Sequence, residues 1–423
     1  MMKLFFISIL SSLTAIGLLA ATPSVSNVTL VQDEASQEVT ISYDLDAEGI
    51  VIAEILTNGV SIGWSNMRSM AGAVNRQVDA GTERRIWWRP DRTWPEGTKI
   101  VAGTVTARVT AYSLDAPPDY VAVDITGTAS KFYYPSEEAL PGGIGDRIYR
   151  TDMMLFRLIK AANVTFRMGI ASEWGYKYNN ANYPHNVTLT NDYWLGVFPV
   201  TQGQFANLLN FATSDCQNRF PANMSSYNLT NGPDAVLCPV DNVSAMCAGP
   251  DYEYGKDIDD FTAGYHSIMY AIRVATGYNR AYLPTLAEWE FAARAGSGDD
   301  RVYEGYNVDD VAWHAGNSQR RLQPVGLKKP NAWGLYDMFG NVWERTRESF
   351  VRPKYTTDQV APMVGSADWA TGSTGGRQAL VGGAFDTPAD DICFASYMSG
   401  TNDAREFWTA APGWGFRVMV PLK

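Results

Sequence analysis

A stretch rich in proline and glycine between residues 129 and 150 divides the sequence into two parts of different character. Its prolines and glycines include Pro135, Pro141, Gly142, Gly143 and Gly145. Such a composition interrupts helices and strands and suits a connector between domains. Because 423 residues exceed what one hydrophobic core usually serves, more than one domain is expected. The sequence predicts a first domain over 22–130, a linker over 131–150 and a second domain over 151–423.

Residues 1–21 are predicted to be a signal peptide that is removed from the mature protein. Lys3 gives a positive start, residues 4–20 are almost wholly apolar, and Ala20-Ala21 offers small residues for cleavage. The alternative is a single membrane anchor, although the apolar run is shorter than the ~20 residues that a span needs. Since no later stretch of sequence predicts a span, we expect an exported protein, periplasmic or secreted, in which disulfides can form.

Residues 22–130 have the period-two hydrophobic alternation of β-strands and no convincing helical period. Val39, Ile41 and Tyr43 alternate with polar neighbours, and residues 104–112 alternate in the same way. Short strands at this spacing predict an antiparallel β-sandwich of the immunoglobulin or fibronectin type III kind. The sequence therefore indicates an all-β first domain.

The first domain contains adjacent tryptophans, Trp87 and Trp88, which should point to opposite sides of one strand. It contains no cysteine and no histidine, so we expect a spacer or docking module rather than a catalytic domain. A sugar-binding patch around Trp87, Trp88 or Trp94 is the alternative to packing of these rings in the core.

The clearest local signal in the second domain is a helix that starts at Thr285. Thr285 and Glu288 have the spacing of a capping box, in which each side chain bonds the other residue's backbone amide. Two further helices are expected, one opened by Thr201 and one over residues 266–275. The remaining sequence, rich in glycine, tryptophan and turn residues, predicts irregular loops. The local pattern thus indicates a compact α+β unit.

Four ordered blocks in this domain carry a family resemblance. They are LPTLAEWEFAAR at 283–294, NAWGLYDMFGNVWE at 331–344, VGGAF at 381–385 and GFRV at 415–418. The set resembles the signature of the formylglycine-generating enzyme, or sulfatase-modifying factor, family, and weaker upstream matches extend it to about residues 155 to 420. The resemblance implies an irregular α+β fold of C-type-lectin-like kind.

The resemblance implies an oxidase only where two cysteine thiolates are available. Enzymes of this family oxidise a substrate cysteine to an aldehyde with copper held by two thiolates, ligands that soft Cu(I) favours. Both thiolates lie between the last two blocks, and between Gly383 and Gly415 this chain has only Cys393. Cys393 is therefore the single candidate catalytic residue, but we expect a buried, unreactive thiol and no bound copper.

The other three cysteines, Cys216, Cys238 and Cys247, lie between the first two expected helices. In an exported protein two of them are expected to form a local disulfide, and all three pairings stay open. The three histidines of the chain are isolated along the sequence. The mononuclear iron chemistry of ergothioneine-type relatives, which needs a histidine triad, is therefore not expected.

The block at 331–344 resembles a structural calcium site of the family. Carried across, the ligands are the carboxylates of Asp337 and Glu344 and the carbonyls of Gly340 and Val342, hard oxygens that suit Ca²⁺. The alternative is that Asp337 caps a turn and that Glu344 pairs with one of the arginines that follow it. A second family calcium site, expected to start near residue 317, lacks its acidic half and is expected to be lost.

The resemblance also suggests which residues face a ligand. The candidates are Trp343, Arg345, Arg417 and the loop from Trp408 to Trp414. Arg345 stands where the family usually has tryptophan, so the family's substrate preference does not transfer to this chain. The alternative for Trp343 and Trp414 is that they are core rings.

Charge and cysteine content separate the possible functions. The chain has 34 Lys+Arg against 45 Asp+Glu, a net charge of −11, which argues against nucleic acid as a partner. One hypothesis is a calcium-stabilised binding protein without oxidase activity, whose ligand is a protein or glycan such as an exported sulfatase or a polysaccharide. The other is a divergent formylglycine-generating or different oxidative maturation enzyme. The single Cys393 favours the binding protein.

Overall fold

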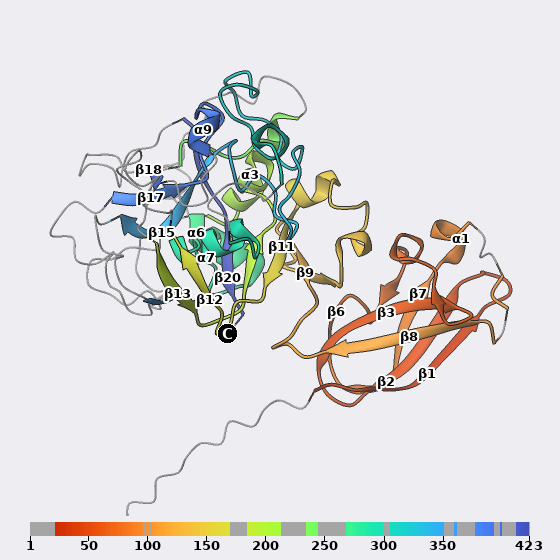
Figure 1. Cartoon of the computed structure of the whole chain (residues 1–423). Coiled ribbons are helices and arrows are strands. Elements are labelled where there is room, and N and C mark those ends of the chain that lie inside the picture. Colours follow the sequence, from red (N-terminus) through yellow and green to blue (C-terminus); the bar gives the residue numbers. More distant parts are fainter. Residues whose placement is uncertain are drawn as a thin grey trace, which may run out of the picture.

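The structure is a computed structural model of the chain. It describes residues 22–95, 99–101, 103–169, 184–212, 234–243, 268–298, 305–350, 359–361, 377–392, 398–399 and 412–422. Figure 1 shows an elongated all-β region beside a larger, more irregular unit. Among the described residues, the structure contains no helix with the length and apolar character needed to cross a membrane.

The all-β region consists of two antiparallel sheets. One has the strand order β1-β2-β7-β5, with bounds Val25–Gln32, Val39–Leu45, Gly81–Trp88 and Ala71–Gly72. The other has the order β4-β3-β6, with bounds Val60–Ser61, Gly49–Thr57 and Arg76–Val78, and β8, Val105–Tyr112, also pairs with β3. Two short helices, η1 (Trp64–Met67) and α1 (Pro90–Thr93), lie between strands.

Alternating side chains explain how these sheets enclose a core. Val39 and Tyr43 of β2 are fully buried, as is Trp88 of β7, whereas Trp87 is 42% exposed. The expectation that the two tryptophans point to opposite sides of the strand is confirmed. The region is all-β as predicted, while its immunoglobulin or fibronectin type III topology stays a prediction.

Strand pairing places residues 120–150 differently from the sequence prediction. Strand β9 (Tyr120–Asp124), expected in the first domain, pairs with β11 (Met153–Ile159) of the larger unit. Strand β10 (Lys131–Tyr134), expected in the linker, pairs with β9, and the short helices η2 (Glu137–Ala139) and η3 (Arg147–Arg150) follow. The prolines and glycines thus form turns between short elements instead of a free connector.

The larger unit is built on a sheet with the order β10-β9-β11-β14-β20, in which β14 is Tyr193–Gly196 and β20 is Met419–Pro421. Residues 187–189 and 193–196 flank a turn, the arrangement of a hairpin, but they do not pair with each other. Instead β13 (His185–Leu189) pairs with β12 (Thr165–Met168) and β16 (Gln359–Ala361) in a separate sheet. The turn at residues 191–192 therefore joins two sheets.

A further sheet has the order β18-β17-β15-β19, with bounds Met398–Ser399, Arg377–Val381, Trp343–Phe350 and Trp414–Phe416. The helices that the described residues form after η3 are α3 (Gln202–Leu209), η5 (Ala235–Leu237), α6 (Ile268–Thr276), α7 (Leu286–Arg294), α8 (Val308–Val311) and α9 (Ala389–Ile392). The regular structure of the larger unit is therefore mostly β with few, short helices.

The helix starts predicted at Thr201 and Thr285 are confirmed. Thr285 caps α7, and its hydroxyl and the Glu288 carboxylate form the reciprocal hydrogen bonds of a capping box. Thr201 caps α3 in the same way with Gln204. Helix α6 ends before Gly277, which has a φ of 64°, a conformation that glycine adopts readily.

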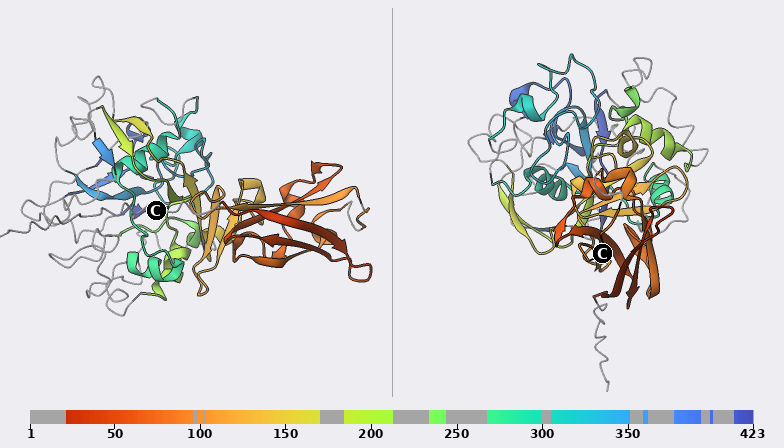
Figure 2. Two further views of the ribbon diagram at one scale, coloured as in Figure 1. Left: turned by 90° about the horizontal axis from the view of Figure 1, so that it is seen from below. Right: turned by 90° about the vertical axis from the view of Figure 1, so that its right-hand side faces the viewer.

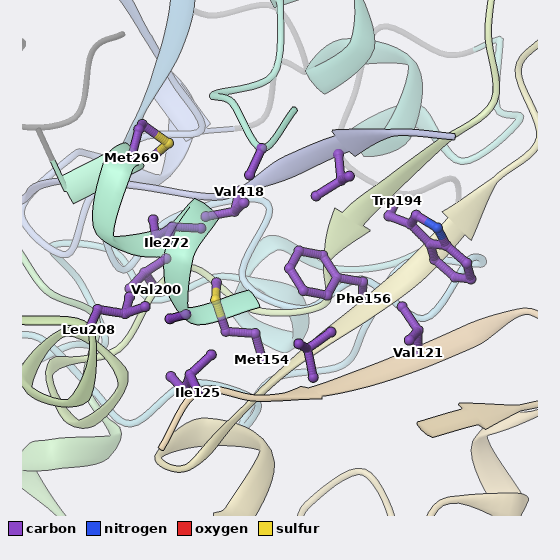
Figure 3. Close-up of a cluster of buried hydrophobic side chains, with 14 of the residues drawn as sticks. Val121, Ile125, Met154, Phe156, Trp194, Val200, Leu208, Met269, Ile272 and Val418 are labelled. Atoms are coloured by element: carbon purple, nitrogen blue, oxygen red, sulfur yellow. The ribbon is translucent and has the colours of Figure 1, made fainter. Parts of the chain in front are cut away.

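One buried cluster connects the β10-β9-β11-β14-β20 sheet, the central sheet of the larger unit, with helices α3 and α6. Figure 3 shows Phe156 of β11 and Trp194 of β14 packed in the same cluster as Leu208 of α3 and Ile272 of α6. Ile50 and Ile52 of β3, in the all-β region, belong to the same cluster. The hydrophobic core therefore continues from the larger unit into the first region.

Candidate functional site

The second and the last family-like blocks (331–344 and 415–418) lie side by side, because β15 and β19 are parallel neighbours. Trp343 lies opposite Trp414, Glu344 opposite Gly415, and Arg345 opposite Phe416. Since side chains alternate along a strand, Trp343 and Arg345 point to one face and Glu344 to the other. The two faces have different surroundings.

Arg417 follows β19 and is completely buried. Its Nε donates to Glu344 Oε2 at 3.1 Å, and its Nη2 donates to Glu344 Oε1 and to the Tyr336 carbonyl, both at 2.7 Å. Its Nη1 donates to the carbonyls of Gly196 and Val197 at 2.7 and 2.8 Å. Because all five guanidinium N–H groups have acceptors, the expectation that Arg417 faces a ligand is corrected: it joins the central sheet to β15.

Glu344 is buried on the same face, with 1% of its surface exposed. Besides its ion pair with Arg417, its Oε2 accepts a hydrogen bond of 2.7 Å from Trp289 Nε1 of α7. Its cationic partner is therefore Arg417, and neither Arg345 nor Arg347, the arginines that come directly after it. Burial removes water from both charges, so each depends on the other for compensation.

Asp337 is also buried, with 1% exposure, and has a φ of 51°. Its Oδ2 accepts a 2.7 Å hydrogen bond from the Gly326 amide, and Oδ1 a longer one, 3.3 Å, from Asn341 Nδ2. Within the described ranges no lysine or arginine lies at ion-pair distance from it. Desolvation is the main reason that the pKa of Asp337 rises to about 6. This carboxylate is thus short of positive charge.

The predicted calcium ligands fit a cation only in part. The Asp337 carboxylate fits, because it is buried, undercompensated and an oxygen donor. The Glu344 carboxylate does not fit as it lies, because Arg417 and Trp289 occupy both oxygens. The Gly340 carbonyl accepts the Val342 amide at 2.7 Å. The calcium site stays a prediction.

The opposite face brings together three of the predicted ligand-facing residues. Arg345 lies with its guanidinium carbon 5.1 Å from the centre of the Trp414 ring, and its Nε donates to the Val243 carbonyl at 2.6 Å. Arg345 is 2% exposed and Trp343 9%, whereas Trp414 is partly exposed. Trp343 and Arg345 are therefore buried residues, and Trp414 alone of the three reaches the surface. Trp408 lies outside the described residues.

Cys393, the candidate catalytic residue, lies outside the described residues, as do Cys216 and Cys247. Cys238 has a free, partly buried thiol whose Sγ lies 3.8 Å from the Asp234 carbonyl oxygen. Burial raises the pKa of Cys238 to about 12. Because the thiolate is the nucleophile and the metal ligand, burial disfavours the reactive form of this thiol.

Three further residues hold this site together and were not predicted from the sequence. Trp289 binds Glu344, and Asn341 Oδ1 accepts the Gln323 amide at 3.0 Å. Asp241, which is fully buried, accepts the Gly413 amide at 2.8 Å. Trp289 and Asn341 lie within the family-like blocks, and that position could have marked them as site residues. Asp241 had none, because its partner is 172 residues away.

The ordered blocks, two of which are joined by the buried Arg417–Glu344 pair, lead to the class of protein. The family described as "Sulfatase-modifying factor enzyme 1-like domain" matches residues 158–421. This range is more than half of the chain, and the chain belongs to that family. The membership predicted from the sequence blocks is thus confirmed, with nearly the predicted bounds.

Two curated relatives are similar to part of the chain. "Chaperone protein LppX" of Paenibacillus barcinonensis is 30% identical over 192 residues, which cover 40% of this chain and 66% of that protein, just under two thirds of its length. The "Formylglycine-generating enzyme" of Mycobacterium tuberculosis is 28% identical over 237 residues, which cover 47% of this chain and 75% of that protein. The two relatives thus carry names of different roles.

Solved structures are similar at a lower level. "Treponema denticola variable protein 1" has a TM-score of 0.45 and 23% identity, and covers 63% of this chain and 95% of its own. PvdO from Pseudomonas aeruginosa has a TM-score of 0.44 and 16% identity, over 63% of this chain and 94% of its own. Similarity at this level says nothing about activity.

Proposed function

We propose that this protein is an exported binding member of the family and does not work as a formylglycine-generating oxidase. The observation that carries the proposal is the scarcity of available thiolates. Only Cys393 lies between Gly383 and Gly415, and burial raises the pKa of the described Cys238 thiol to about 12. A copper site needs two thiolates, and the segment between Gly383 and Gly415 supplies one.

The proposed ligand surface is the exposed edge of Trp414 together with the loop that begins at Trp408. A partly exposed ring over a buried, hydrogen-bonded arginine is a rigid aromatic contact of the kind enriched in recognition surfaces. The relative named a chaperone, 30% identical, supports a protein ligand. An exported sulfatase is one such partner, and a polysaccharide is the other class of ligand.

Calcium is proposed as a structural ion bound at Asp337. The support is the carboxylate's burial, its raised pKa of about 6 and the lack of a cationic partner among the described residues. Millimolar Ca²⁺ is expected to raise the melting temperature relative to EGTA, and Asp337→Ala to remove that increase. Asp386→Ala, at an exposed position, is the matched control. An equal response to Ca²⁺ in both variants and the wild type would rule out Asp337 as a ligand.

The absence of oxidase activity can be tested directly. Titration with Cu(I) is expected to show no tight binding of one copper ion per chain, either in the purified wild-type protein or in Cys393→Ser. Incubation with a sulfatase-type CxPxR peptide, followed by mass spectrometry, is expected to leave its cysteine intact. Tight copper binding that Cys393→Ser removes, together with aldehyde formation, would overturn the proposal in favour of an oxidative maturation enzyme.

A further inference from the structure

The outer face of the β1-β2-β7-β5 sheet carries a tryptophan that belongs neither to the hydrophobic core nor to the site around Glu344 and Trp414. Of the tryptophans in the described residues, only Trp87 falls in the exposed class, with 42% of its surface accessible. The next residue, Trp88, fills the core on the other side of the sheet. Figure 2 shows that this all-β region projects away from the larger unit.

The Trp87 ring is held in position by a glycine. Gly72 of β5 pairs with Ile86 and has a φ of 92°. A Cβ atom on Gly72 would lie 2.7 Å from the Cε3 and Cζ3 atoms of the Trp87 ring. The indole therefore rests directly on the Gly72 backbone, a close approach that a side chain would prevent. An exposed ring with a fixed orientation loses little conformational entropy when it binds a ligand.

Residues with hydroxyl groups are neighbours of Trp87 on the same face of the sheet. The pairing register places Val31, Thr40, Trp87 and Ala71 in one row across the four strands. The next row contains Thr29, Ser42 and Arg85. In the part of the chain that the structure describes, no hydrogen bond is made by the Trp87 N–H or by the Thr40 and Ser42 hydroxyls. These groups are free to donate to or accept from a ligand.

The charge on this face favours a neutral ligand. Arg85 is the charged residue of the two rows, and its Nη2 lies 3.9 Å from Glu83 Oε2 with both side chains exposed. The two charges offset one another locally, and the net charge of the chain is −11, which repels polyanions. A flat aromatic ring beside unpaired hydroxyls complements a neutral, polyhydroxylated molecule.

We propose that the outer face of the β1-β2-β7-β5 sheet binds a neutral oligosaccharide, with one sugar ring stacked on Trp87. The apolar face of the sugar covers the indole, and its hydroxyl groups bond Thr40, Ser42 and the indole N–H. This surface is separate from the one proposed around Trp414, so either can exist without the other.

Native affinity electrophoresis of the full-length mature chain tests this proposal. The gels contain soluble neutral polysaccharides, namely mixed-linkage β-glucan, xyloglucan, glucomannan, arabinoxylan and dextran, with alginate as an acidic comparison. At least one neutral polymer is expected to retard the protein, and Trp87→Ala to weaken that retardation about tenfold or more, the size of one lost aromatic contact. Trp87→Phe is expected to keep part of the binding.

Tyr306→Ala, which removes another exposed aromatic ring, is the matched control and should bind as the wild type does. The melting temperature of Trp87→Ala should stay near that of the wild type, because the ring lies outside the core. Lack of retardation by all five neutral polymers, or retardation that Trp87→Ala leaves unchanged, would overturn the proposal. The proposal would also be contradicted if alginate retarded the wild type but not Trp87→Ala. It would be contradicted as well if the ligand bound through Trp87 were a protein and not a polysaccharide.

Discussion

At the scale of single residues, the buried Arg417–Glu344 pair controls the architecture of the larger unit. Glu344 lies in β15 and Arg417 directly follows β19, the parallel neighbour of β15, and the hydrogen bonds of the two side chains reach β14 and α7. Arginine suits this position because its planar guanidinium offers five donors in a fixed geometry. The pair therefore links four elements that lie far apart in the sequence.

Breaking this pair from one side is expected to be more harmful than removing both charges. Arg417→Met leaves Glu344 buried without a cation and should lower the free energy of unfolding by about 3–5 kcal/mol. The double variant Arg417→Met with Glu344→Gln should lose less than the sum of the single variants. Urea unfolding of the four proteins measures this coupling, and strictly additive losses would contradict it.

Asp337 should make stability depend on pH when metal is removed with EGTA. The pKa of this carboxyl is raised from 3.8 to about 6, so between these values the native state holds a proton that the unfolded state has released. Its contribution to stability therefore falls as pH rises from 3.8 to about 6 and stays low above that. At pH 7, Asp337→Asn should be more stable than the wild type by about 1–3 kcal/mol.

That advantage of Asp337→Asn should become small near pH 4, where the native carboxyl is protonated and the unfolded one, with a pKa of 3.8, is close to half protonated. Urea unfolding in EGTA at pH 4, 5.5 and 7 gives the difference directly. A constant difference across this range would show that the substitution acts through packing and not through charge.

At the scale of elements, the helix starts were predictable and the strand partners were not. A capping box depends on residues three positions apart, such as Thr285 and Glu288, so the local sequence contains all the needed information. The partners of β9 and β14 depend on the whole sheet. Strand periodicity shows which residues face the core, but it does not show which neighbour supplies the hydrogen bonds.

The capping of α7 offers a test at this scale. Thr285→Ala removes the hydroxyl that accepts the Glu288 amide at 3.1 Å and should lower the free energy of unfolding by about 1 kcal/mol. Thr285→Ser keeps the hydroxyl and should cost much less. Guanidinium unfolding compares the two, and an equal loss in both would assign the effect to the methyl group.

At the scale of the whole molecule, the all-β region and the larger unit share contacts that argue against a flexible tether. Trp64 of η1 packs against the clusters of both regions. The Tyr133 amide donates to the Asn75 carbonyl at 2.8 Å, and Arg76 lies 5.5 Å from the centre of the Phe132 ring. The predicted linker is therefore part of the junction.

Unfolding of the two regions is expected to be coupled through Trp64. Trp64→Ala should lower stability by about 2–4 kcal/mol and separate one calorimetric transition into two. Trp94, which packs on Trp88 within the all-β region at 5.8 Å between ring centres, provides the control: Trp94→Ala should lower stability without separating the transitions. Two transitions already present in the wild type would contradict the coupling.

The sequence by itself determined the all-β character of the first region, the helix starts and the family of the larger unit. These depend on periodicity, on bonds between near neighbours, or on ordered blocks. Only the tertiary structure decided that Arg417 is buried against Glu344, 73 residues away, and that β9 and β10 belong to the central sheet. Burial and charge pairing depend on which distant segments meet, and no local pattern encodes that.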